Sequence, residues 1–293
     1  LFPYTTLFRS APADSKKKKK LGVLFANKDN PFYATMLDGI KDYAADSYEI
    51  VYTQTPFSVE AQCRALTDMS KEGLAGLIFT PIDNPEILEH LLPFYEKGVP
   101  IVTLNSDLPK SSRLAFVGCD GYKNGRASGE LLSMVTGGRA EVAIITGSRE
   151  ALSHELRIRG FSDYIREYSP GMTIEEIIEC KNDDYTAYDL TNRLLLAHPT
   201  LSALYFTAGG VEGACKALDQ MTVPRKIAVV SFDIMETTKK YLKKGIISAA
   251  LIHDPHSQGY KACEIIDSFI TDGTRPKTPE VYFPISVLLK EMV

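Results

Sequence analysis

Polar side chains recur directly after the predicted strands of this chain, where they could bind a small hydroxyl-rich molecule. Asn and Asp side chains hydrogen-bond to hydroxyl groups, and aromatic rings can stack on the C–H faces of such a ligand. Phe32 and Tyr33 supply two rings after the first predicted strand and its polar loop. The polar strand-end positions are Asn27 to Asn30, Asp83, Asn84, Asn105 to Asp107, Tyr185, Thr207, Asp233 and His253. Each alone is typical of a loop or a helix cap, and the two rings are equally typical of a core, but their recurrence at successive strand ends predicts a binding site.

Asp233 and Arg157 are the charged candidates for ligand contact. Asp233 ends an apolar strand and could accept hydrogen bonds from neighbouring hydroxyls of a sugar. The alternative is that Asp233 caps a helix that begins at Met235 or Glu236, because Asp is a favoured capping residue. Arg157 lies on a predicted helix whose start faces the same edge, and its planar guanidinium suits paired oxygens.

Two stretches resemble enzyme motifs but depart from them at essential positions. The stretch Ala208 to Gly213 follows a strand and opens a helix as a dinucleotide-binding loop does, but Ala208 replaces its first glycine. A pattern of this kind more commonly marks a glycine-rich start of a helix. His253 and His256 are separated by Asp254 and Pro255, which spoils helical geometry, and no third metal ligand is near. We therefore expect no cofactor, no metal and no enzyme, with an NAD-linked enzyme as a distant alternative.

Composition and charge place the chain among ordinary globular proteins. It has 293 residues, of which 44% are hydrophobic and 24% charged, and its formal net charge is −4. This charge gives no basic surface for nucleic acid apart from the run Lys16 to Lys20. No apolar run approaches the roughly 20 residues of a membrane span, so we expect no membrane partner. Five dispersed cysteines without a CxxC pair favour free thiols in a reducing cytoplasm.

The first twenty residues, 1–20, are set apart from the predicted fold. Leu1 to Ser10 resembles a translated sequencing adapter, and such an artefact is excluded before a fold is inferred. Ala11 to Lys20 is typical of a flexible, solvated linker that ends in a basic run. We expect the native sequence to continue upstream of Ala11.

Strands and helices alternate regularly from Leu21 onwards. Short, continuously apolar stretches such as Ala75 to Thr80 are typical of strands buried on both faces. Alternation with short loops predicts parallel strands joined by right-handed crossovers. A second series of similar size begins after Asp120. The chain is therefore predicted to be an α/β protein of two similar, doubly wound parallel-sheet lobes.

Seven short motifs carry a resemblance to a known fold family. They are Asn30-Pro-Phe-Tyr33, Ile101 to Asn105, Phe116 to Asp120, Arg157-x-x-Gly160-Phe161, Ala197 to Ala203, Val229 to Asp233 and Gln258-Gly259. Their order and spacing match type I periplasmic-binding-protein folds. From Leu21 to its C-terminus the chain resembles the effector-binding core of LacI/GalR-like transcriptional regulators, and it is also similar to ribose- and galactose-type sugar-binding proteins.

The resemblance implies two lobes that close on a ligand held between them. The chain would cross between the lobes three times, near Asp120, Ile252 and Tyr282. The N-terminal lobe would comprise residues 21–120 and 253–281, and the C-terminal lobe residues 121–252 and 282–293.

The resemblance also assigns ligand contacts to nine residues. Those that match the family's positions are Asn30, Phe32, Tyr33, Arg157, Tyr185 and Asp233. Three others depart from the pattern, because Asn105 replaces an Asp, Thr207 an Asn and His253 a Gln. These departures leave the identity of the ligand open.

We therefore expect the core of a cytoplasmic repressor that closes its lobes on a small sugar or polyol. Operator DNA would bind to an N-terminal headpiece missing from this chain, and the core would form a homodimer. The free cysteines, the lack of an export signal and the basic run before the first strand favour this interpretation. The alternative is the sugar-binding receptor of an ABC uptake system.

Overall fold

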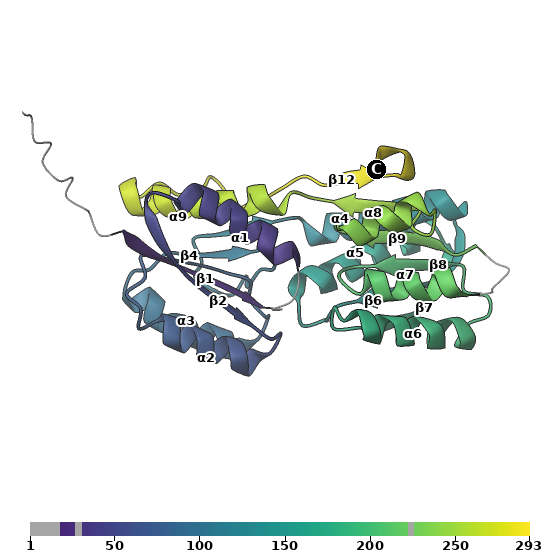
Figure 1. Cartoon of the computed structure of the whole chain (residues 1–293), viewed down its shortest axis with the longest axis horizontal. Helices are drawn as coiled ribbons and strands as arrows, with labels where there is room; N and C mark the ends of the chain where they lie inside the picture. Colours follow the sequence, from purple (N-terminus) through teal and green to yellow (C-terminus); the bar gives the residue numbers. More distant parts are fainter. Residues whose placement is uncertain (1–17, 27–30, 222–225) are drawn as a thin grey trace, which may run out of the picture.

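The structure, a computed structural model, describes residues 18–26, 31–221 and 226–293. Two α/β lobes lie end to end along the long axis of the molecule (Figure 1). Each lobe contains one six-stranded sheet with helices on both faces. The predicted fold class, two similar doubly wound α/β lobes, is confirmed.

The N-terminal lobe is built on an entirely parallel sheet. Its strands are β1 (Lys19–Ala26), β2 (Tyr48–Thr55), β3 (Gly76–Phe79), β4 (Ile101–Leu104), β5 (Ala115–Gly118) and β11 (Glu280–Tyr282). Its helices are α1 (Pro31–Ala44), α2 (Val59–Met69), α3 (Pro85–Glu96) and α9 (Pro255–Asp272). The strand order is β11-β5-β4-β3-β1-β2, with α1 and α9 covering one face and α2 and α3 the other.

The C-terminal lobe repeats this plan with one antiparallel strand at the edge. Its strands are β6 (Arg139–Thr146), β7 (Gly171–Glu179), β8 (Ala203–Phe206), β9 (Ala228–Phe232), β10 (Ala249–Ile252) and β12 (Ser286–Leu288). Its helices are α4 (Gly121–Thr136), α5 (Leu152–Tyr168), α6 (Asp184–Ala197), α7 (Val211–Gln220), α8 (Glu236–Lys243) and the short 3₁₀ turn η1 (Lys290–Met292). The strand order is β12-β10-β9-β8-β6-β7. Helices α4 and α5 cover one face, and α6, α7 and α8 cover the other.

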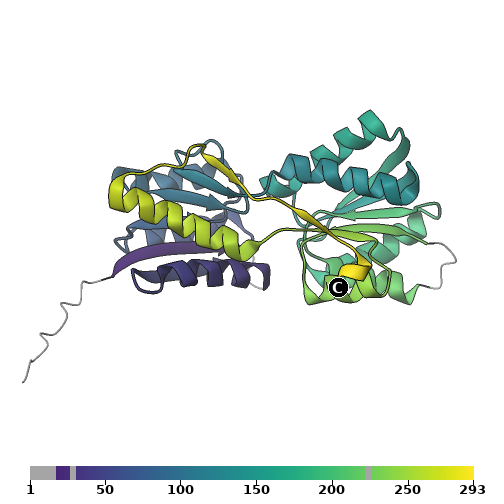
Figure 2. The same cartoon turned by 90° about the horizontal axis from the view of Figure 1, so that it is seen from above.

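The chain passes between the lobes at three places (Figure 2). These are the connections from β5 to α4, from β10 to α9 and from β11 to β12. In the last of them, β11 pairs in parallel with β5 of the first sheet, and β12 pairs antiparallel with β10 of the second. Three connections that lie close together allow one lobe to rotate against the other about a common hinge.

The central strands are largely apolar because both faces of each sheet are buried. Every residue of β3, β4 and β8 is buried, because helices cover both sides of these central strands. Several helices begin where a polar side chain satisfies a free backbone N–H group. Asp120, Asp183 and Asp254 cap α4, α6 and α9 in this way.

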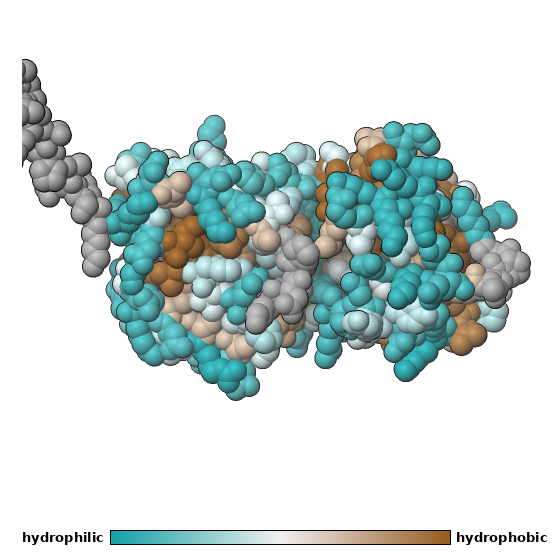
Figure 3. Space-filling model, in the orientation of Figure 1, coloured by the Kyte–Doolittle hydropathy of each residue, from teal (hydrophilic) through white to brown (hydrophobic). Residues whose placement is uncertain are grey.

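The surface is polar over most of the face drawn in Figure 3. Among the described residues, no helix combines the length and apolar character that a membrane span requires. All five cysteines are buried and free.

Candidate ligand-binding site

An enclosed cavity, which we call the inner chamber, lies between the lobes at the carboxyl ends of strands from both sheets. Its lining is Phe32, Tyr33, Phe57, Thr80, Pro81, Asn105 and Ser106 from the N-terminal lobe, and Ala151, Ser153, His154, Arg157, Asn182, Ala208, Gly209 and Asp233 from the C-terminal lobe. Its volume is about 30 Å³, which holds about two water molecules. This volume is too small for a sugar ring, so a ring can occupy the chamber only when the lobes stand further apart than they do in this structure.

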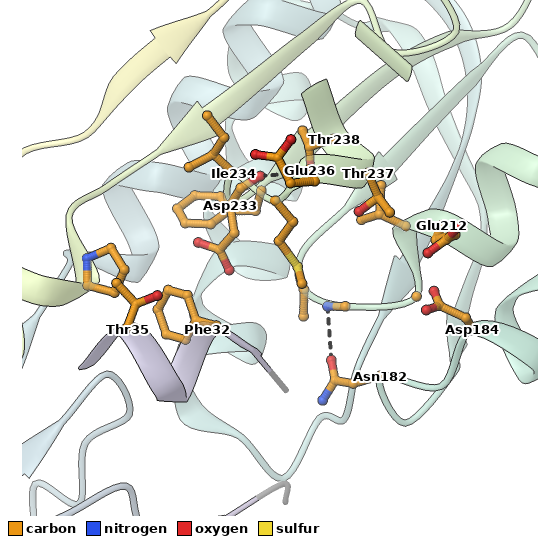
Figure 4. A pocket seen from close by; sticks show the side chains of 17 residues that line it. Phe32, Thr35, Asn182, Asp184, Glu212, Asp233, Ile234, Glu236, Thr237 and Thr238 are labelled. Atoms are coloured by element: carbon orange, nitrogen blue, oxygen red, sulfur yellow. Dashed lines mark hydrogen bonds between the residues drawn. The ribbon is translucent and has the colours of Figure 1, made fainter. Parts of the chain in front are cut away.

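A second and larger cavity, the outer crevice, adjoins the inner chamber and has a volume of about 580 Å³ (Figure 4). It is lined by Phe32, Thr35 and Pro255 from the N-terminal lobe, and by Asn182, Asp184, residues 208–212 and residues 232–238 from the C-terminal lobe. The two cavities share Phe32, Asn182, Ala208, Gly209 and Asp233. They therefore adjoin each other.

Asp233 carries the negative charge of the inner chamber and forms an ion pair with His253. Its Oδ1 atom lies 2.7 Å from Nε2 of His253. Burial opposes ionisation of Asp233, but the facing imidazole and then Arg157 hold the pKa of this carboxyl below its ordinary value. Burial also opposes the charge on His253, but Asp233 raises the pKa of this imidazole to about 9. Both side chains are therefore charged at neutral pH.

The backbone is left-handed at two of the predicted contact residues, Asn105 with φ of 65° and Asp233 with φ of 69°. Each residue directly follows a central strand, and each still donates its N–H to the neighbouring strand, Asn105 to Val117 and Asp233 to Leu251. Non-glycine residues rarely adopt this conformation, and those that do cluster at functional sites. The helix cap of α8 is Met235. The alternative interpretation of Asp233 as a helix cap is therefore wrong.

Arg157 is held rigidly in the wall of the inner chamber, with 4% of its surface exposed. Its guanidinium lies 3.6 Å from the centre of the Phe232 ring, and Nη1 donates a 2.6 Å hydrogen bond to the carbonyl of Thr207. Its Nε has no hydrogen-bond partner among the residues that the structure describes. A buried guanidinium with an unused donor is suited to a ligand oxygen.

Phe32 and Tyr33 form the aromatic side of the site on α1. Tyr33 is buried against Phe25 at a ring distance of 5.1 Å, so it belongs to the core of the lobe and also lines the inner chamber. Burial raises the pKa of Tyr33 to about 12, although a hydrogen bond with Asn105 acts in the opposite direction. The partly exposed Phe32 meets the His253 ring edge-on at 5.2 Å and lines both cavities. Tyr33 is therefore both a core residue and a lining residue of the inner chamber.

Of the other predicted contacts that the structure describes, Thr207, Tyr185 and His253 lie off the lining of both cavities. Asn30 is outside the described residues. Thr207 is fully buried, and its hydroxyl donates to Thr146 while its carbonyl holds Arg157. Tyr185 lies in the first turn of α6 and is 87% exposed. His253 lies behind Asp233, with Nδ1 2.6 Å from Nε2 of Gln258.

Sequence reasoning missed Asn182 and His154, which both line the inner chamber. Asn182 follows β7, and its Oδ1 accepts a 3.0 Å hydrogen bond from the N–H of Gly209. His154 precedes Arg157 by one helical turn and thus lies on the same side of α5. Burial, and next the charge of Arg157, lower the pKa of His154 to about 4, so this imidazole is neutral. Two signals in the sequence could have found them. Asn182 lies just after a strand, and His154 lies at helical spacing from Arg157.

The two enzyme-like stretches have structural roles in the fold. Gly213 lies so close to α6 that a Cβ atom there would be 1.7 Å from the carbonyl oxygen of Asp184, and Gly210 begins α7 with φ of 87°. Pro255 opens α9, so His253 and His256 turn to different partners, Asp233 and Asp42. Within the described part of the chain, no group of three His, Cys, Asp or Glu side chains could hold a metal.

Comparison with known proteins assigns the chain to a family. The family model of the periplasmic binding protein domain matches residues 21–274. The chain belongs to this family. The ribose import binding protein RbsB of Bacillus subtilis (strain 168) is 23% identical over 271 residues, covering 91% of this chain and 87% of that protein. The HTH-type transcriptional repressor PurR of Aliivibrio fischeri (strain MJ11) is 23% identical over 288 residues, covering 92% of this chain and 81% of that protein.

Solved structures agree with this periplasmic binding protein fold. GanP, a glucose-galactose binding protein from Geobacillus stearothermophilus, superposes with a TM-score of 0.87 at 28% identity, covering 94% of this chain and 99% of that chain. The relatives of this periplasmic binding protein domain thus include import binding proteins as well as repressors. Assignment to the LacI/GalR-like regulators stays a prediction.

Proposed function

We propose that this periplasmic binding protein domain binds a small sugar or polyol in the inner chamber and closes its lobes on it. The observation that carries the proposal is the pairing of charged groups from one lobe with aromatic and amide groups from the other. Asp233 and Arg157 line the C-terminal side of the chamber, and Phe32, Tyr33 and Asn105 line the N-terminal side. A ligand held by both sets favours the closed arrangement of the lobes.

Each group has a defined task in this proposal. The Asp233 carboxylate accepts hydrogen bonds from two neighbouring hydroxyls, and Nε of Arg157 donates to a ring or hydroxyl oxygen. The amide of Asn105 can donate and accept, and Phe32 presents its ring to the C–H face of the ligand. Relatives named for ribose, allose, and glucose and galactose support a sugar as the ligand class.

Neutral sugars or polyols are expected to raise the melting temperature of the protein with one binding site per chain. A ligand at a concentration of 100 times its Kd stabilises the native state by about 2.7 kcal/mol, which corresponds to a shift of roughly 4 °C for a chain of this size. A thermal-melt panel of pentoses, hexoses and polyols, followed by calorimetry on the hits, measures this. NAD and free amino acids serve as controls that should leave the melting temperature unchanged. If no sugar or polyol in the panel binds, the proposal is wrong.

More narrowly, we propose that this binding unit is the effector core of a cytoplasmic LacI/GalR-like transcriptional regulator whose operator DNA is bound by a headpiece. Support comes from the repressor PurR and from the catabolite control protein A of Priestia megaterium, which match 92% and 83% of this chain. The second candidate is the receptor of a sugar uptake system. It is favoured by GanP, which this chain covers almost completely.

The oligomeric state is expected to distinguish these two roles. The resemblance to regulators implies a core that associates side by side into a two-fold dimer, whereas receptors act as monomers. Light scattering at micromolar concentration should therefore give twice the chain mass of 32.4 kDa. A monomeric mass at every concentration would contradict the regulator proposal and favour the uptake receptor.

A further inference from the structure

The outer crevice is much larger than the inner chamber that it adjoins. Its volume of about 580 Å³ compares with about 30 Å³ for the chamber. Pockets that hold ligands of drug size have volumes of roughly 300–1,000 Å³. The two cavities share five lining residues, so the crevice directly adjoins the chamber.

The lining of the outer crevice combines apolar surface with hydroxyl groups from both lobes. Ile234 and Met235 provide apolar side chains from the C-terminal lobe, and Phe32 adds an aromatic ring from the N-terminal lobe. Thr35 on α1 and Thr237 on α8 add hydroxyls from opposite sides. Sugars present C–H faces and hydroxyls together, so this mixture suits a sugar ring.

The acidic residues around the crevice stabilise the fold and do not require a cationic ligand. Asp184, Glu212 and Glu236 lie in the first turns of α6, α7 and α8, where a helix dipole favours negative charge. Asp184 also accepts a 3.1 Å hydrogen bond from the N–H of Gly213, and Glu236 pairs with Lys239 at 2.7 Å. The crevice therefore fits a neutral, hydroxylated group.

Building on the proposed sugar binding, we propose that the outer crevice is a second subsite and that the ligand is a disaccharide. One ring lies in the inner chamber against Asp233 and Arg157. The second ring extends past Phe32 into the outer crevice, between Thr35 of one lobe and Thr237 of the other. Closure of the lobes then brings both rings into contact with both lobes.

Calorimetry with matched sugars tests the second subsite. Glucose and galactose are titrated beside maltose, cellobiose, lactose and melibiose, so that each disaccharide is compared with its own component rings. At least one disaccharide is expected to bind ten-fold or more tightly than its monosaccharides. If monosaccharides bind and no disaccharide in an extended panel binds more tightly, the second subsite is wrong and the proposed function stands. If none of these disaccharides and no pentose, hexose or polyol of the melt panel binds, the proposed function is wrong and the second subsite with it.

A variant that fills the outer crevice separates the two subsites. Thr237→Phe is expected to remove the disaccharide advantage, a loss of ten-fold or more, and to change monosaccharide affinity less than two-fold. Thr35→Phe fills the same crevice from the other lobe and serves if Thr237→Phe does not fold. Thr271→Phe, at an exposed position near the end of α9, is the matched control and should change neither affinity. An unchanged disaccharide advantage in a folded crevice variant would overturn the proposal.

Discussion

Replacing Asp233 by Asn is expected to weaken sugar binding by roughly 30-fold to 1,000-fold, a loss of about 2–4 kcal/mol. The substitution keeps the shape of the side chain but removes the charge that faces His253 and Arg157. A neutral amide is a weaker acceptor for sugar hydroxyls than a carboxylate. It also leaves the buried Arg157 guanidinium without its counter-ion and removes the charge that keeps His253 protonated. Calorimetry with a sugar identified in the melt panel measures the change.

Asp267→Asn is the matched control for this experiment. Asp267 is partly buried in the N-terminal lobe, where its carboxylate accepts hydrogen bonds from the hydroxyls of Tyr43 and Tyr48 at 2.9 and 2.7 Å. It lines neither cavity, so its substitution should lower stability and leave sugar affinity within about two-fold of the wild type. Normal sugar affinity in folded Asp233→Asn protein would remove Asp233 from the ligand site.

The free energy of unfolding is expected to fall by about 2–3 kcal/mol as the pH rises from 6.5 to 9, through the ion pair of His253 and Asp233. The pKa of His253 is raised from 6.5 to about 9 in the folded protein. Between these values the folded state binds more protons than the unfolded state. The stabilising contribution of the ion pair is therefore fully present below pH 6.5 and is lost as the pH rises through 9. The pKa of Asp233 is lowered, so its contribution disappears only at acid pH, below the ordinary value of 3.8.

Two histidine variants isolate this pH dependence in urea unfolding of the unliganded protein. His253→Gln should flatten the decrease between pH 6.5 and 9, because the titrating group is gone. His256→Gln removes a similar contact, the exposed 2.8 Å pair with Asp42, and should leave the decrease unchanged because exposed pairs contribute little. A decrease of equal size in the wild type and in His253→Gln would show that the pair does not stabilise the folded state through its charge.

Position at a strand end predicted several chamber residues, because parallel strands present their carboxyl ends at one edge of a sheet. Phe32, Asn105, Arg157 and Asp233 line the inner chamber for this reason or because the start of their helix faces the same edge. A strand-end position leaves the direction of the side chain open. Tyr185 follows β7 like the others, but the chain turns there so that Asn182 lines the chamber and Tyr185 faces solvent.

Thr207 shows a second limit of prediction from the sequence. Its position at the end of β8 predicts a ligand contact. Its hydroxyl instead donates a 2.7 Å hydrogen bond to the hydroxyl of Thr146 on the neighbouring strand β6. A buried polar group takes whichever partner the sheet register offers. The register between β6 and β8 pairs Ile145 with Phe206 and thereby brings the two threonines together. No property of Thr207 alone contains this information.

The sequence by itself determined the two doubly wound lobes, because alternation of apolar strands and amphipathic helices is a local pattern that each segment carries independently. The tertiary structure decided which polar groups meet. Parallel pairing of β9 with β10 sets Phe232 beside Leu251, and this register places Asp233 and His253 next to each other across the strand ends. Their mutual charge, the pKa of each and the polarity of the chamber all depend on a distance of 2.7 Å. Such a distance is set by the packing of whole strands and is absent from either residue's local sequence.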